Sequence, residues 1–125
     1  MNDRILGATA AVSAGLAVIL GALAAHALQD TLEAAGNYDS WRTAGLYHLT
    51  HSIAALFLAQ AGFRRCAWTM LAGVLLFSGS IYVLCLSEGV SWLGPVTPVG
   101  GVLMIGAWLT VAVGYVKKGA PRGSN

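Results

Sequence analysis

Four long apolar stretches constrain what this chain can fold into, because each is close to the roughly 20 residues that an α-helix needs to cross a bilayer. They cover about residues 5–28, 43–63, 66–87 and 96–116, and the first holds no charged residue. The connections near residues 64–65 and 88–95 are short, so they hold neighbouring helices antiparallel and side by side. The chain is therefore predicted to be all-α, an integral membrane bundle of four transmembrane helices.

Composition supports lipid as the main solvent. Hydrophobic residues make up 57% of the chain and charged residues 10%, whereas a soluble domain carries roughly 25% charged residues. The net charge of +2 is too small to suggest a nucleic-acid partner. Cys66 and Cys85 lie about 28 Å apart along one predicted helix, too far for a mutual disulfide. We expect one domain over residues 1–120, with residues 121–125 as a disordered tail.

The distribution of cations predicts the orientation. If the N-terminus, the second connection and the C-terminus share one side, that side carries a single acid, Asp3, and six basic residues: Arg4, Arg64, Arg65, Lys117, Lys118 and Arg122. The opposite side then carries Arg42 with four acids: Asp30, Glu33, Asp39 and Glu88. The positive-inside rule places the first set, and with it both termini, in the cytoplasm.

Two features near the outer side need separate interpretation. The small residues around His26 resemble a signal-peptide cleavage site, but the apolar run before them is longer than a signal core, so the helix is expected to be retained. In the polar connection 29–42, Leu28, Leu32 and Ala35 fall at helical spacing and predict a short interfacial helix. Trp41 and Trp92 are expected in the interfacial aromatic belt.

Small residues recur every fourth position on two of the predicted helices. Such stripes let helix backbones approach closely in lipid, within the bundle or between protomers. They predict helix-packing surfaces, and a homo-oligomer or a membrane-protein partner, at Gly7, Ala11 and Gly15 on the first helix and at Gly106, Thr110 and Gly114 on the last.

Polar residues inside the apolar stretches are the candidates for function, since a bilayer penalises them unless they face the protein interior or a wet cavity. His48 and His51 share a helix face and lie about 9 Å and about 13–14 Å below Arg42. The other polar groups also fall in the outer half of the membrane. The sequence therefore predicts an outward-facing pocket with these candidate residues: His26, Trp41, Arg42, Thr43, Tyr47, His48, His51, Ser78, Ser80, Tyr82 and Thr97.

The chemistry of such a pocket stays open. His26, His48 and His51 are candidate ligands for zinc or copper, although the spacing alone commits to no metal. Haem ligation and quinone binding are equally compatible, so no cofactor is assigned. No nucleophile elbow and no intramembrane carboxylate is present, and no catalytic residue or enzyme activity is predicted. Each polar residue also has a structural alternative, as an interhelical or intrahelical hydrogen bond.

Four segments carry a resemblance to a known family. The runs Gly21–Leu28, Trp41–Ala44 with Tyr47, His48 and His51, Phe77–Tyr82, and Leu93–Gly101 resemble, in the same order, the motifs of the YgdD-like proteins. These are small bacterial inner-membrane proteins with a eukaryotic transmembrane relative. The resemblance implies a four-helix membrane domain with no established enzymatic activity. The chain departs from the family's pattern mainly at Ala24, where a glycine is common.

Three functions follow as hypotheses. The preferred one is a binding or accessory module with a polar outward-facing pocket. The second is a scaffold that acts through helix–helix contacts with a partner, in which the histidines only tie helices together. The third is an oligomeric channel or transporter for small solutes, against which the apolar inner halves of the helices argue.

Overall fold

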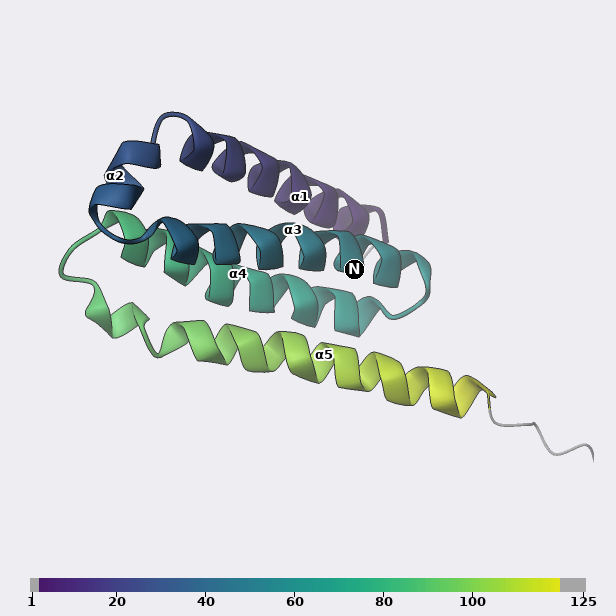
Figure 1. Cartoon of the computed structure of the whole chain (residues 1–125). Coiled ribbons are helices and arrows are strands. Elements are labelled where there is room, and N and C mark those ends of the chain that lie inside the picture. The colour runs from purple at the N-terminus through teal and green to yellow at the C-terminus, as the bar shows by residue number, and fades with distance from the viewer. Residues whose placement is uncertain (1–2, 120–125) are drawn as a thin grey trace, which may run out of the picture.

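The computed structural model describes residues 3–119, and Figure 1 shows its helices. The elements are α1 (Asp3–Ala25), α2 (Gln29–Ala34), α3 (Tyr38–Gln60), α4 (Arg64–Leu86), the short 3-10 helix η1 (Ser91–Leu93) and α5 (Val96–Gly119). The described part of the chain is thus all-α, as predicted. The predicted tail, residues 121–125, lies outside the described residues.

The bounds of α3 differ most from the apolar stretch predicted over 43–63. The helix begins at Tyr38 and includes Asp39 in its first turn. The negative charge of Asp39 is favourable there, because the N-terminal end of the helix dipole is positive. It ends at Gln60, because Gly62 adopts a φ of 85° and the N–H of Phe63 bonds to the carbonyl of Leu58 at 2.9 Å. This is the glycine-terminated end of a Schellman motif.

The first helix also ends earlier than predicted, at Ala25 rather than Leu28. The N–H of Leu28 folds back onto the carbonyl of Leu23 at 2.8 Å, which closes the helix and turns the chain toward α2. The short interfacial helix predicted in the polar connection is present as α2.

Within residues 3–119, three helical segments are able by length and composition to cross a membrane: α1, α4 and the stretch Ser91–Gly119. α3 has the same length as α1 and α4 but falls outside this group. Its hydropathy is lower because it contains polar residues such as His48, His51 and Ser52, and these three are buried against neighbouring helices. The side chains it exposes include Leu46, Ile53 and Phe57.

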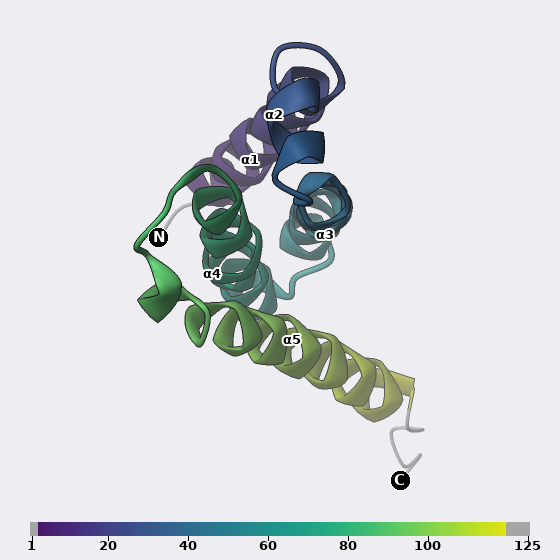
Figure 2. The same cartoon turned by 60° about the vertical axis from the view of Figure 1, so that its left-hand side comes forward.

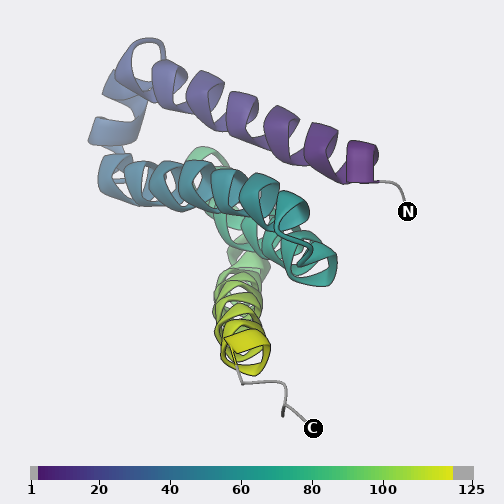
Figure 3. The same ribbon diagram turned by 90° about the vertical axis from the view of Figure 1, so that its right-hand side faces the viewer.

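The helices form an open array instead of a closed four-helix ring. α3 packs on α1 and α4, and α4 packs on α3 and α5, whereas α1 touches α4 only sparsely. Figure 2 shows α1 and α5 on opposite sides of α4. In Figure 3, α1 and α3 run across the view while α5 is seen nearly end-on, so α5 crosses them at a wide angle.

The two ends of the array differ in charge. At one end, Arg64 at the start of α4 pairs with Asp3 at the start of α1, with 2.6 Å between Nε and Oδ1. Lys118, near the end of α5, lies over the ring of Phe63 at 4.5 Å from its centroid. The start of α1, the α3–α4 connection and the end of α5 therefore meet at one end, and α2 lies at the other (Figure 1).

At the α2 end, a small apolar cluster closes the space between the helices. It comprises Ala24, Leu32, Trp41, Ala44, Tyr82 and Cys85. Leu32 of α2 is completely buried in it, and Trp41 donates its indole N–H to the carbonyl of Leu20 at 3.1 Å. Because Trp41 is only 2% exposed, the prediction of an interfacial belt position for it is wrong, while Trp92 is 68% exposed.

The closest approach between helices lies at Gly73 and Gly100, where α4 crosses α5. A Cβ atom at Gly100 would come within 2.3 Å of the backbone nitrogen of Phe77 and 2.7 Å of the backbone oxygen of Gly73. The predicted stripes lie elsewhere. A Cβ at Gly15 or Gly106 would meet nothing within 4 Å. At Gly7 it would meet only the end of the Leu56 side chain at 3.8 Å, and at Gly114 it would meet the ring of Phe63.

Replacing Gly100 with alanine should therefore destabilise the protein, because the methyl group collides with backbone that has no room to move. We expect a loss on the order of 1–3 kcal/mol in the free energy of unfolding, measured by thermal unfolding in detergent. Gly106→Ala is the matched control on the same helix and should be neutral or stabilising. Equal effects of the two substitutions would contradict the close backbone contact between α4 and α5 at Gly73 and Gly100.

Candidate functional site

The two intramembrane histidines of α3 face different neighbours. Residues three apart on an α-helix differ in direction by about 60°, and on a helix packed between several others this angle separates two interfaces. His48 points to α1 and α4, where it contacts Ser13 and Tyr82. His51 points to α5, where it contacts Trp108. The histidines predicted to share one pocket therefore occupy two separate environments.

His48 is the centre of a hydrogen-bond network that joins three helices. Its Nδ1 lies 3.0 Å from the hydroxyl of Tyr82 on α4, and its Nε2 lies 3.2 Å from Oγ of Ser13 on α1. Ser13 is 2.7 Å from Oγ of Ser52, and Ser52 donates to the backbone carbonyl of His48 at 2.6 Å. The network thus begins and ends on the same residue of α3.

The direction of every hydrogen bond in this network follows from its last bond, in which Ser52 donates to a backbone carbonyl that can only accept. A hydroxyl has one hydrogen, and Ser52 uses its own on the carbonyl of His48, so the hydrogen between the two serines belongs to Ser13. Ser13 must then accept from Nε2 of His48. No carboxylate lies within the membrane part of the described chain to balance a charge, so the ring is neutral and its Nδ1 accepts from Tyr82.

His51 has an equally determined arrangement. Its Nδ1 donates to the carbonyl of Tyr47 at 2.9 Å, and its Nε2 accepts the indole N–H of Trp108 at 3.2 Å. The ring of Tyr47 stacks on it with centroids 5.5 Å apart. Both nitrogens are occupied, so His51 acts as a link between α3 and α5.

The serines of α4 also join helices. Ser78 donates to the carbonyl of Ala44 on α3 at 2.8 Å. Ser80 donates to the carbonyl of Phe77 at 2.9 Å and accepts from Thr97 of α5 at 2.5 Å. These bonds match the structural alternative considered for serines in membrane helices.

The remaining predicted pocket residues lie apart from both histidines. His26 and Arg42 are exposed at the α2 end of the array. Thr43 is also exposed and lines a separate hollow of about 370 Å³, together with Asp39 and Asn37. Among residues 3–119, no three His, Cys, Asp or Glu side chains come together where they could hold a metal ion.

A groove of about 470 Å³ lies between α1 and α4, where these two helices diverge. Its polar floor consists of Ser13, His48, Ser78 and Tyr82. Its walls are mainly apolar: Thr9, Val12, Leu16 and Leu20 from α1, and Trp68, Leu71, Ala72, Val74, Leu75 and Gly79 from α4. We call this the α1–α4 groove. Its volume falls within the range typical of small-molecule sites.

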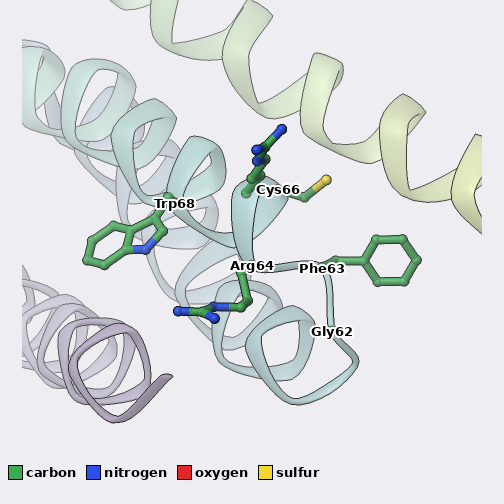
Figure 4. A pocket seen from close by; sticks show the side chains of 6 residues that line it. Gly62, Phe63, Arg64, Cys66 and Trp68 are labelled. Carbon is green, nitrogen blue, oxygen red and sulfur yellow. The ribbon is translucent and has the colours of Figure 1, made fainter. Parts of the chain in front are cut away.

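A second hollow of about 600 Å³ lies at the cation-bearing end, around the first turn of α4. Figure 4 shows that its side chains spread apart: Arg64 and Trp68 point to one side of the turn, and Phe63 and Cys66 to the other. No polar groups converge there, so the hollow offers no defined site.

The sequence prediction missed the partners that give the two histidines their roles. Ser13 and Ser52 are small hydroxyl residues that lie within apolar runs, and Trp108 is an aromatic residue within the last apolar stretch. A signal for Ser13 and Ser52 was available, since a membrane-embedded histidine requires a polar partner at a similar depth on another helix. Ser13 and His48 both lie near the middle of their helices.

The network predicts coupling between some substitutions and independence between others. Tyr82→Phe and His48→Ala should be non-additive in the free energy of unfolding, with a coupling energy of about 0.5–1.7 kcal/mol, because each removes the same hydrogen bond. Tyr82→Phe and Trp108→Phe, which act on different histidines, should add to within about 0.5 kcal/mol. Thermal unfolding in detergent measures both cycles. Strong coupling between Tyr82 and Trp108 would show instead that the histidines share one site.

Comparisons with known proteins place the chain in a family. Residues 20–101 match the family described as protein of unknown function (DUF423). The chain is 38% identical to the UPF0382 membrane protein YwdK of Bacillus subtilis, over 90% of this chain and 94% of the relative. It is also 38% identical to the UPF0382 inner membrane protein YgdD of Escherichia coli K12, over 94% and 93% of the two chains.

A UPF0382 membrane protein of Schizosaccharomyces pombe is 38% identical over 83% of this chain and 95% of its own. No solved structure matches. The expected resemblance to YgdD-like proteins is thereby confirmed. Several helices are apolar enough to cross a membrane, and the relatives are named as membrane proteins. The chain is a multi-pass membrane protein, and it belongs to the DUF423 family of proteins of unknown function.

Proposed function

We propose that this protein is a binding module that holds a hydrophobic small molecule in the α1–α4 groove. The observation that carries the proposal is the combination of a polar floor and apolar walls in one cavity. Apolar walls with a few convergent polar groups are the usual composition of small-molecule sites. The polar groups of the floor come from three helices, so the fold positions them together.

The groove supports entry from the lipid. α1 and α4 are in sparse contact along it. Val12 and Leu75 on its two walls are 64% and 72% exposed. A molecule dissolved in the bilayer can therefore reach His48 sideways between the helices, without passing through water. This differs from the pocket open to the outer aqueous side that the sequence suggested.

The topology that accompanies this proposal has four spans in the bacterial inner membrane, with both termini in the cytoplasm. α3 counts as the fourth span because His48, His51 and Ser52 face its neighbours. Near the middle of the helix it exposes apolar side chains and Thr50, whose hydroxyl is satisfied by the carbonyl of Leu46. The end where Arg64 pairs with Asp3 also carries Arg65 and Lys118, and the positive-inside rule assigns that end to the cytoplasm.

A reporter test checks this topology. Green fluorescent protein fused after the C-terminus should fluoresce, since this fusion stays in the cytoplasm. Alkaline phosphatase inserted at Asn37, in the turn between α2 and α3, should be active because that turn is exported. A periplasmic C-terminus, or a cytoplasmic Asn37, would exclude the four-span arrangement.

Lipid analysis tests binding. Ala72 lines the groove, its side chain is exposed, and it takes no part in the polar floor, so Ala72→Phe fills the space and leaves the network intact. We expect the wild-type protein, extracted gently, to carry an enriched small molecule or lipid detectable by mass spectrometry, and Ala72→Phe to lose it. Ala112→Phe is the matched control, because Ala112 is exposed on α5 and does not line the groove. Equal content in all three proteins would refute the binding function.

Scaffolding is the second candidate, and one observation favours it. Ala11 and Gly15 on α1 and Gly106 and Thr110 on α5 are exposed in a single copy, so these small residues are available for close contact with another helix. In this alternative the chain forms a homo-oligomer or joins a membrane-protein partner. Gly106→Leu should then disrupt the assembly without altering the groove.

A further inference from the structure

We propose that the α1–α4 groove selects a neutral, membrane-soluble molecule that donates a hydrogen bond, such as a long-chain alcohol, over anions and over ligands that can only accept. This inference rests on the proposed function and names the ligand class for the same site. It follows from where the hydrogens of the groove lie.

Each polar hydrogen on the floor already has an acceptor within the protein. The network around His48 uses the hydrogens of Tyr82, His48 and Ser13. Ser78 gives its hydrogen to the carbonyl of Ala44. On the wall beside the floor, Thr9 gives its hydrogen to the carbonyl of Ile5 at 2.8 Å.

What the floor still offers is a set of oxygen lone pairs. A hydroxyl oxygen has two acceptor positions and one donor. The oxygens of Ser13, Ser78 and Tyr82 therefore retain acceptor capacity after their internal bonds are made. An incoming O–H can bond to them without breaking the network, whereas a carbonyl, an ether or a carboxylate finds no available hydrogen there.

An acceptor-only ligand would have to displace one of the internal bonds. In a low-dielectric interior the group released by that displacement is left unsatisfied, which costs more than a new bond returns. An anion meets a further penalty, because no cationic side chain lines the floor. The floor thus discriminates by hydrogen-bond polarity as well as by charge.

One donor lies at the other end of the groove. Trp68 makes no hydrogen bond to the described residues, so its indole N–H is available. It is fourteen positions from Tyr82 along α4, about 20 Å, and near the cation-bearing end. This separation prevents Trp68 from serving a polar group that is bound at the floor.

Three probes of equal chain length test the inference: oleyl alcohol, its methyl ether and oleate. Binding to the full chain in detergent micelles is measured by native mass spectrometry. We expect the alcohol to bind about fivefold more tightly than the ether, the difference of one hydrogen bond, and oleate to bind most weakly. Ala72→Phe should reduce binding of the alcohol, and Ala112→Phe should not.

Ser13→Ala provides a sharper test, because it leaves one hydrogen on the floor without an acceptor. If Nε2 of His48 keeps that hydrogen, Nε2–H is open; if the proton moves to Nδ1, it bonds to Tyr82 and frees the Tyr82 hydroxyl hydrogen. In either tautomer the floor acquires a donor. The ratio of alcohol to ether affinity should therefore fall to about one. Ser13→Ala is matched by Trp68→Phe, which should leave the wild-type ratio unchanged.

The outcomes separate the inference from the proposed function. Equal binding of alcohol and ether to the wild type, or tightest binding of oleate, overturns the selectivity; if Ala72→Phe still blocks that binding, the groove remains a binding site. A ratio that Ser13→Ala does not change also overturns the inference, since the free hydrogen would then have no effect. If none of the three probes binds to the wild type, both proposals fail.

Discussion

The hydrogen-bonding demand of His48 in a medium without water is the constraint on which the rest of the structure depends. Lipid can neither donate nor accept, so the two ring nitrogens must find partners on other helices. Ser13 of α1 and Tyr82 of α4 supply them. These bonds fix the rotation of α3 about its axis and set the depth of α1 and α4 relative to it. The groove is a consequence, because α1 and α4 both approach α3 at this level but contact each other only sparsely.

Two kinds of contact hold the helices together: hydrogen bonds between polar side chains, and close backbone contact at glycine residues. α3 is held to its neighbours by the hydrogen bonds of His48 and, further along the helix, by apolar packing that buries Ala55 and Leu58. α4 and α5 meet instead at Gly73 and Gly100, where the absence of side chains lets two backbones touch. Dispersion over a close backbone contact needs no partner of specific chemistry, whereas a buried histidine needs one at a defined position. The network of His48 therefore sets which residues of α1, α3 and α4 lie opposite one another, whereas the glycine crossing sets how closely α5 approaches α4.

Much of the fold could be predicted from the sequence, because apolar length and the placement of cations are properties of single segments. The all-α character and the meeting of Asp3, Arg64 and Lys118 at one end required no knowledge of packing. The depth of a residue in the membrane and the direction of its side chain around the helix axis depend on how the helices pack, so they were predicted less well. The depth count started at Arg42, four residues inside α3, and treated two histidines about 60° apart as one face. The partners that separate them, Ser13 and Trp108, lie 35 and 57 positions away in sequence. Which residues meet across such separations is decided by tertiary packing.

The order of the helices along the chain has a consequence for biogenesis. The hydrogen bonds around His48 involve α1, α3 and α4, and α4 ends before α5 has been translated. A ribosome-bound chain can therefore complete the polar centre of the protein while the last helix is still in the exit tunnel. α5 can then pack on α4 at the glycine crossing. Its Thr97 bonds to Ser80, and its Trp108 donates a hydrogen bond to Nε2 of His51. The order of the helices along the chain thus allows the hydrogen bonds around His48 to form before α5 arrives.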